Sequence, residues 1–456
     1  MILEGIVVAV TCSLLAFFLS GARSLPYLLY FLAYIPFLTL DASVGGLEDT
    51  SNLTAGNLVF KFIARTATSA GFLLLFLRKP AAHLQICRLQ SLPVLLFVGW
   101  ALLSVHRAQV PLISLARLGE LGMFFVAGIV LFTDRDRDHG PRTVARWHCL
   151  ALLQVLLVAV YFEQTRPELA YWVSESGIKR LGHKLLNANT LGFASVAVGL
   201  WSTVELKEPR ERQRALFFEK LVPILALGLA LYVLLGARSR SAMVTMLIGQ
   251  GIVWFPWSRS SLQRRVAFAS VASAAFFLTF FNLDVIHEWF LRGDSAANLK
   301  SGTGRLSLWG ALLHEQLPRT PFLGTGYLML SDQGRFFHEG YHWSNAHNTY
   351  LFALISTGLP GLVALLCVAL TPWRSLFRRL FTTPPVERPF WCLLFALQSV
   401  ILVAGVTGFG ISGYPNPSMF FHYALYSYAV TGARSAARSA QPDHVSPPAL
   451  AGPVLA

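Results

Sequence analysis

Long apolar stretches recur along almost the whole chain, and short polar loops separate them. A membrane-spanning helix needs about 20 mostly apolar residues, and the pattern predicts about thirteen spans, with twelve as an alternative because the first two are short. The predicted spans cover residues 2–20, 25–40, 60–77, 92–106, 113–133, 145–162, 188–204, 216–235, 242–257, 266–283, 348–371, 389–410 and 417–433. The predicted fold is therefore an all-α integral membrane protein, a polytopic bundle of about 12–13 transmembrane helices.

Four regions follow from this pattern. Residues 1–283 are expected to form the N-terminal transmembrane helices, and their first segment, MILEGIVVAV, lacks the basic region of a signal peptide and is expected to be a retained span. Residues 284–347 form one large loop, within which 304–317 has the apolar spacing of an amphipathic helix lying on the membrane, carried by Leu306, Trp309, Leu312 and Leu313. Residues 348–433 return to transmembrane helices, and the polar tail 434–456 is expected to be disordered and cytoplasmic.

Composition agrees with a membrane setting. Hydrophobic residues make up 54% of the chain and charged residues only 13%, and the mean hydropathy is +0.54. No polar block is long enough for a separate soluble domain. The five cysteines fall in or near apolar spans without CxxC pairing, which is typical of small core residues.

The basic residues predict the orientation. Lys and Arg are enriched in cytoplasmic loops, and the densest basic loops alternate correctly if all are cytoplasmic: 78–88, 134–146, 207–214, 258–265 and 374–388. Topology thus explains most of the net charge of +14, and no nucleic-acid partner is needed to account for it. The loops expected on the outer face are 41–58, 163–187, 236–241, 284–347 and 411–416.

Several outer basic residues contradict this bias. They are Arg180, Lys184, Arg238, Arg240 and Arg305, from three separate loops next to span ends. Arginine binds two phosphate oxygens at once through its planar donors, so together they predict a phosphate site at the membrane surface. Contact with lipid headgroups is the alternative for each of them.

Three histidines crowd the end of the large loop: His338, His342 and His347. A histidine next to a substrate hydroxyl can act as a general base. His347 is the first candidate and His338 the second. Spacings of four and five residues are also compatible with zinc, but Glu339 is the only acid nearby. No metal or other cofactor is therefore expected, and simple hydrogen bonding to the backbone remains open for each histidine.

His347 begins the stretch HNTYLFALISTGLPG, which enters the membrane as a helix. Asn348 is available to cap or orient that helix. Gly358, Pro360 and Gly361 lie about three turns deeper, where they predict a bend or a close helix contact. A kinked helix would hold His347 over a cavity.

The pattern His347-Asn348, nine residues, Gly358, two residues, Gly361 resembles the HNx9GxxG signature of O-antigen ligases and related membrane oligosaccharyltransferases. The likeness extends over about residues 180–370. It includes Asn187 and Asn189 in LGHKLLNANTLGF, the Ser-Arg helix start in ARSRSAMVTM, and an Arg-x3-Trp, Pro-x2-Gly-x-Gly loop through Arg305, Trp309, Pro321, Gly324 and Gly326. Phe352 departs from the Gln of many protein-directed relatives, which favours the ligase.

The resemblance implies a GT-C-like enzyme of a Gram-negative inner membrane, with its active site facing the periplasm. The implied donor is a polysaccharide on undecaprenyl pyrophosphate, and the acceptor is a sugar hydroxyl of lipid A core. Arg240 and Arg305, helped by Arg238, Arg180, Lys184 and Asn189, would bind the donor, and His347 would deprotonate the acceptor in an inverting reaction. Asn348, Gly358 and Gly361 would serve the structure of the motif.

Other functions stay open at this point. Within the enzyme class they are an O-antigen polymerase and a protein O-oligosaccharyltransferase. From another class, a polyprenyl-glycan flippase or secondary transporter should place charges at mid-membrane and show repeated broken helices. The candidate residues instead collect at one face, and the sequence shows no internal repeat.

Overall fold

A computed structural model describes residues 51–79, 91–108, 110–133, 140–173, 179–182, 187–207, 216–255, 305–327, 336–338, 341–343, 346–408 and 416–439, with Leu29, Leu32 and Ile411. The predicted spans 2–20 and 266–283, and 25–40 apart from Leu29 and Leu32, lie outside these residues.

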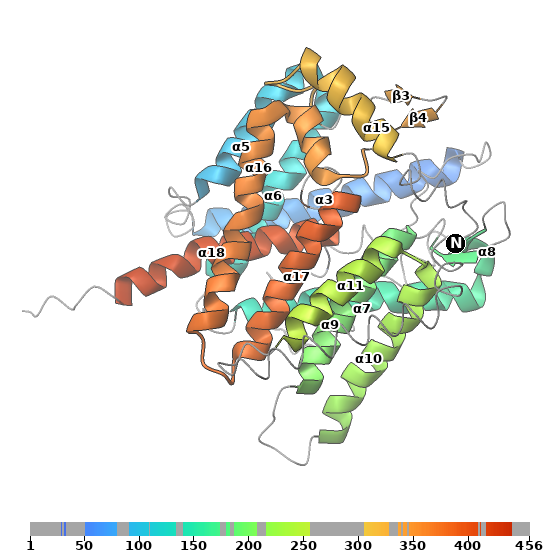
Figure 1. Ribbon diagram of the computed structural model, residues 1–456, viewed down its shortest axis with the longest axis vertical. Coiled ribbons are helices and arrows are strands. Elements are labelled where there is room, and N and C mark those ends of the chain that lie inside the picture. The colour runs from blue at the N-terminus through green and yellow to red at the C-terminus, as the bar shows by residue number, and fades with distance from the viewer. Residues whose placement is uncertain are drawn as a thin grey trace, which may run out of the picture.

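Each predicted span that falls on described residues is a helix (Figure 1). These helices are α3 (Ser51–Arg78), α5 (Leu92–Ser104), α6 (Pro111–Thr133), α7 (Gly140–Thr165), α9 (Ala188–Lys207), α10 (Leu216–Ala237), α11 (Arg240–Trp254), α16 (Thr349–Thr382), α17 (Arg388–Thr407) and α18 (Pro417–Ser439). Helix α18 continues beyond residue 434, where the polar tail was expected to begin.

Five of the described helices are long and apolar enough to cross a membrane. They cover Pro111–Phe132, Gly140–Thr165, Lys220–Ala237, Thr349–Thr382 and Arg388–Thr407. The chain is therefore a helical membrane protein, while the total of 12–13 spans, the GT-C-like arrangement and the large outer loop stay predictions.

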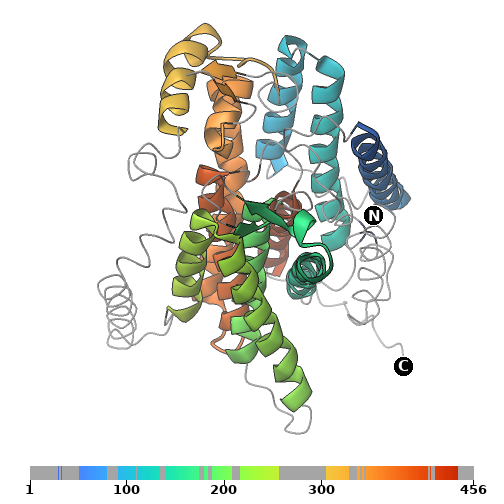
Figure 2. The same cartoon turned by 90° about the vertical axis from the view of Figure 1, so that its right-hand side faces the viewer.

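Helix α9 lies at the centre of one group of helices. It packs against α7, α10, α11 and α17, and Figures 1 and 2 show α9, α10 and α11 side by side. A Cβ on Gly192 of α9 would lie 2.6 Å from the Cβ of Ala242 in α11, so this glycine allows α9 and α11 to approach closely near their first turns. Helix α17 links this group to the other helices because it also packs against α16.

Helix α16 is broken at Gly358, which has φ 72° and ψ −175°. The chain thus forms a first half over 349–357 and a second half over 359–382. The expected bend and close packing at this position are both confirmed, because the backbone of Gly358 is not helical and a Cβ there would collide with the carbonyl of Phe322.

Short elements surround the ends of these helices. They are the 3₁₀ turns η3 (Val105–Arg107) and η6 (Leu317–Arg319), α8 (Pro167–Ala170), α15 (Arg305–Ala311), the π-helical turn η5 (Leu312–Gln316), and the hairpins β1–β2 (Tyr171–Val173, Lys179–Leu181) and β3–β4 (Phe336–His338, Tyr341–Trp343).

The amphipathic helix expected over 304–317 is α15 followed by η5. Its predicted apolar face is divided, because Leu312 is buried whereas Leu306 and Leu313 are exposed, and Leu308 is buried instead. Leu308, Ala311 and Leu312 thus share the face that is buried, while Leu306 and Leu313 share the opposite, exposed face.

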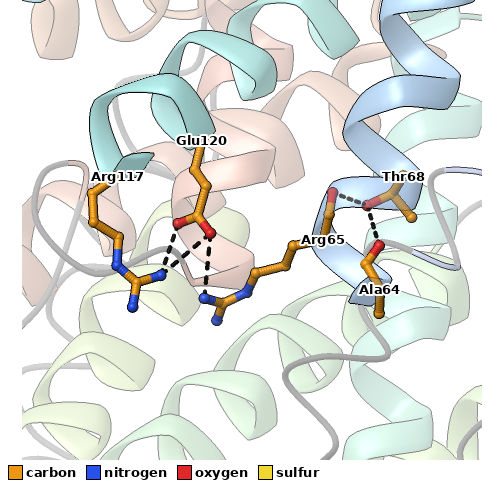
Figure 3. A network of polar contacts seen from close by, with 5 residues as sticks. All are labelled: Ala64, Arg65, Thr68, Arg117 and Glu120. Carbon is orange, nitrogen blue, oxygen red and sulfur yellow. Dashed lines mark hydrogen bonds and ion pairs between the residues drawn. The ribbon is translucent and has the colours of Figure 1, made fainter. Parts of the chain in front are cut away.

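A charged cluster joins α3 to α6 well inside both helices (Figure 3). The Glu120 carboxylate accepts hydrogen bonds from Arg117 Nη1 at 3.0 and 3.3 Å and lies 3.5 Å from Arg65 Nη1. Ionisable groups within transmembrane helices are costly unless they pair with one another. The three side chains therefore neutralise one another in part and tie α3 to α6.

Candidate active site

His347 directly precedes the N-cap residue of α16 and has a left-handed backbone conformation, with φ 50°. This conformation costs a residue other than glycine about 1–2 kcal/mol, so neighbouring contacts must hold it. Asn348 is the N-cap of α16, and its Oδ1 accepts from the amides of Tyr350 and Leu351 at 3.0 Å each. The indole of Trp309 donates to the carbonyl of Ala346 at 2.7 Å. Both sides of His347 are thus fixed, and the predicted capping role of Asn348 is confirmed.

The Pro-x2-Gly-x-Gly loop, residues 321–327, fills the break in α16. Three backbone hydrogen bonds join them: Thr325 N to Ile355 O at 2.8 Å, Gly326 N to Ser356 O at 3.1 Å, and Leu359 N to Pro321 O at 2.8 Å. A helix break leaves carbonyls without their usual donors, and this loop supplies replacements. The Pro-x2-Gly-x-Gly motif and the HNx9GxxG motif are therefore two parts of one structure.

Two motif glycines are required at this contact. Gly358 and Gly324 have φ 72° and 66°, a region that favours glycine. A Cβ on Gly358 would also collide with the carbonyl of Phe322, and one on Gly324 with the backbone of Ser356. No larger residue fits either position without moving the loop away from the helix.

Arg305 begins α15 and reaches the end of α17. Its Nη1 donates to the carbonyl of Thr407 at 3.1 Å, while Trp309, one turn further along, binds Ala346 next to His347. The Arg-x3-Trp spacing puts both side chains on one side of the helix. Helix α15 thus connects the end of α17 to the residue that precedes the candidate base.

Arg240 begins α11 beside the first turn of α9. The hydroxyl of Ser239 donates to Asn189 Oδ1 at 2.9 Å, and Asn187 Oδ1 accepts from the amide of Asn189 at 2.8 Å. Arg238 has a left-handed conformation, with φ 47°. The amino-terminal ends of α9 and α11 therefore lie together, and helix amino termini attract anions. Asn189 holds this arrangement through Ser239.

Arg180 lies on β2 and contacts the end of α10. Its Nε donates to the carbonyl of Ala237 at 3.2 Å, and its guanidinium lies 6.0 Å from the ring centre of Trp172. Ala237 is followed directly by Arg238. One donor of Arg180 thus stabilises the carboxyl end of α10, in the same region as Arg238.

Electrostatics link Arg240, Arg305 and His347. Burial lowers the pKa of Arg305, and the charge of Arg240 lowers it further. Burial, together with the charge of Arg305, lowers the pKa of His347 to about 4. The charge of Arg240 thus acts on Arg305 and that of Arg305 acts on His347, whose neutral imidazole can accept a proton.

One acidic side chain near this region was not predicted from the sequence. Glu163, near the end of α7, accepts hydrogen bonds from the hydroxyls of Tyr171 and Tyr232, the latter at 2.8 Å. Burial and the bond to Glu163 raise the pKa of Tyr171. These partners are 8 and 69 residues away in sequence, so no local motif could have indicated the cluster.

Some predicted site residues cannot be placed. Lys184 lies outside the described residues. The backbones of His338 and His342 belong to the β3–β4 hairpin, with His338 opposite Tyr341 and His342 opposite Phe337, but their side chains lie outside the description. Across the part of the chain that is described, no three His, Cys, Asp or Glu side chains gather as metal ligands.

Residues 225–366 match the family model described as O-antigen ligase. Over this segment the chain is similar to the O-antigen ligase family. The segment contains Arg240, Arg305, His347 and both motif glycines of α16, so the match covers the residues that the structure brings together. No curated protein matches the chain. This similarity favours a glycosyltransferase-like activity of the ligase or polymerase kind.

Proposed function

We propose that this protein is an O-antigen ligase that transfers a polysaccharide from undecaprenyl pyrophosphate to a sugar hydroxyl of lipid A core. The observation that carries the proposal is the meeting of Arg240, Arg305 and His347, in which each charge affects the pKa of the next group. Such a site combines positive charge for a pyrophosphate with a base for a hydroxyl. The reaction is assigned to the periplasmic face of the bacterial inner membrane.

Arg240 and Arg305 bind the donor pyrophosphate in this proposal. Both lie at the start of a helix, and guanidinium groups present paired donors to phosphate oxygens. Arg305 is also held in place by the carbonyl of Thr407. Fixed positive groups stabilise charge that grows on the leaving pyrophosphate without having to reorganise. Arg238, Arg180 and Lys184 are assigned supporting roles around the same anion.

His347 acts as the general base. It takes the proton of the acceptor hydroxyl, the acceptor oxygen bonds to the anomeric carbon from the side opposite the pyrophosphate, and the bond from that carbon to the pyrophosphate oxygen breaks. Undecaprenyl pyrophosphate leaves, and the configuration of the anomeric carbon inverts. The anionic donor offsets the charge of Arg305, so donor binding raises the pKa of His347 toward that of an effective base.

Analysis of lipopolysaccharide from a deletion strain tests the function. Loss of a ligase leaves lipid A core without O-chains while the lipid-linked polymer persists, and the wild-type gene restores the chains. A polymerase would instead leave single repeat units on the core. A protein-directed transferase would leave lipopolysaccharide unchanged, and either of these results would overturn the proposal.

A further inference from the structure

Trp100 of α5 holds the break in α16 from outside the matched segment. Its indole N–H donates to two carbonyls at once, that of Phe322 at 3.0 Å and that of Thr357 at 2.9 Å. Thr357 ends the first half of α16 and Phe322 belongs to the loop that fills the break. One side chain thus joins both parts of the contact.

The carbonyls before the break need such donors because the helix cannot supply them. Ser356 would bond to the amide of residue 360, which is proline and has no N–H. The amide of Leu359, the usual partner of Ile355, donates to Pro321 instead. The loop amides serve Ile355 and Ser356, and Trp100 serves Thr357. Its indole therefore completes the carboxyl end of the first half-helix.

The chain that follows Trp100 supports the same loop. Arg107 in η3 donates through Nη1 to the carbonyl of Gly324 at 3.4 Å. A Cβ on Gly326 would lie 2.6 Å from the amide nitrogen of Ala108, so these backbones are in close contact. Residues 100–108 thus contact both the loop and the break in α16.

We propose that Trp100 is a positioning residue for the transfer reaction, fixing the angle of the first half of α16 and so aiming His347 at the reacting atoms. The inference rests on the proposed function. His347 and Thr357 lie at opposite ends of this half-helix, which is about 13 Å long at 1.5 Å per residue. A tilt of only about 5° at Thr357 would move His347 by about 1 Å, and a misplacement of that size can cost about 10² in rate.

The test compares Trp100→Phe with Trp373→Phe. Trp373 lies in the second half of α16, where its indole donates to Ser399 Oγ at 3.1 Å, so its replacement by Phe also removes one indole hydrogen bond from the same helix. We expect Trp100→Phe to lower kcat about 10- to 100-fold with KM within about twofold, and Trp373→Phe to leave both constants near wild type. Trp100→His, which keeps a ring N–H, should retain more of kcat than Trp100→Phe.

Hydrogen exchange of the purified protein without substrate gives a second result that does not depend on activity. The backbone amides of residues 355–359 and 361 should exchange faster in Trp100→Phe and not in Trp373→Phe. Wild-type kcat with unchanged exchange in Trp100→Phe would overturn the inference, and so would equal losses in the Phe and His variants. If Trp100→Phe does not accumulate in the membrane, Arg107→Gln is used in its place. We expect this variant also to lower kcat and to speed amide exchange. Unchanged kcat and unchanged exchange in Arg107→Gln would count against the positioning role. Absence of transferase activity in the wild-type protein would refute the proposed function but not the role of Trp100, because hydrogen exchange still tests the contact between Trp100 and the break in α16.

Discussion

Arg305 lies close enough to His347 for its guanidinium charge to lower the pKa of the imidazole. Burial is the larger cause, and the two together bring this pKa to about 4. His347 is consequently neutral at pH 7 and able to accept a proton. Because a bound anion would offset the charge of Arg305, the pKa of His347 depends on whether the donor occupies the site.

This relationship predicts the pH dependence of transfer. The pKa of His347 is lowered from 6.5 to about 4, so its basic form is present above about pH 4 and is lost as pH falls through that value. We expect kcat/KM for the donor to stay nearly constant between pH 8 and about pH 5. The acid limb of kcat should lie at higher pH than that of kcat/KM, because bound pyrophosphate raises the pKa of His347.

The control for this pH profile is Arg305→Gln, which removes the second cause of the shift. Its residual kcat/KM should fall at a higher pH than in the wild type, since a neutral side chain no longer disfavours the imidazolium. A wild-type acid limb of kcat/KM near 6.5, unchanged by Arg305→Gln, would show that His347 is not the titrating base.

Replacement of His347 itself should abolish transfer. A general base typically contributes 10² to 10⁴ in rate, so His347→Ala and His347→Asn should both be inactive in the gel assay while membrane abundance stays near wild type. Asn tolerates the left-handed conformation at this position, which separates loss of the base from backbone strain. His314, exposed on η5 in the same region, gives the matched control, and His314→Ala should be active. Normal transfer by His347→Ala, with loss in His338→Ala, would assign the base to His338.

Lysine variants separate the geometry of the arginines from their charge. Arg240→Lys and Arg305→Lys keep the charge but lose the paired donors, and Arg305→Lys also weakens the contact to Thr407. Both should be strongly impaired in transfer with purified donor and acceptor. Arg319, exposed at the end of η6, is the matched site, and Arg319→Lys should behave as wild type. Full activity in both site variants would favour general attraction to anionic lipid.

The helices were predictable from sequence because lipid exposure imposes a simple rule, a run of about 20 apolar residues. The predicted span 216–235 is α10 at Leu216–Ala237, and 188–204 is α9 at Ala188–Lys207. The site could be predicted in part for a similar reason. Arg240 and Arg305 each begin a helix and His347 precedes the N-cap of a third, next to loops that the charge bias predicts on one face.

The supports of the site could not be predicted because their partners are far apart in sequence. Trp100 binds carbonyls 222 and 257 residues away, and carbonyl groups carry no sequence signature. The spacing of Gly358 and Gly361 indicated a break but not the loop that fills it. The predicted apolar face over 304–317 was incomplete because it assigned Leu312 to the side of Leu306 and Leu313, whereas Leu312 lies on the buried side with Leu308.

The break at Gly358 should tolerate no side chain. In Gly358→Ala the φ of 72° costs about 1–2 kcal/mol, and the added Cβ meets the carbonyl of Phe322. We expect a lower melting temperature and loss of transfer, because the loop can no longer stay in the break. The matched variant is Gly228→Ala in α10, where a Cβ meets nothing within 4 Å. A Gly358→Ala protein as stable and active as Gly228→Ala would contradict the described contact.

Transfer should not need a divalent ion, because Arg240 and Arg305 already bring positive charge to the place assigned to the leaving pyrophosphate. The histidine cluster at His338, His342 and His347 provides the competing hypothesis, since three imidazoles within ten residues are potential zinc ligands. The charge of Arg305 already disfavours positive charge on His347, and a cation at its ring would have to overcome that effect. The test is the purified enzyme with lipid-linked donor and lipid A core acceptor, assayed after exhaustive EDTA treatment and again with added Mg²⁺, Mn²⁺ or Zn²⁺. Undiminished transfer after EDTA is the expected result. Activity that is lost to the chelator and restored by one ion would refute the arginine mechanism and make the histidines ligands.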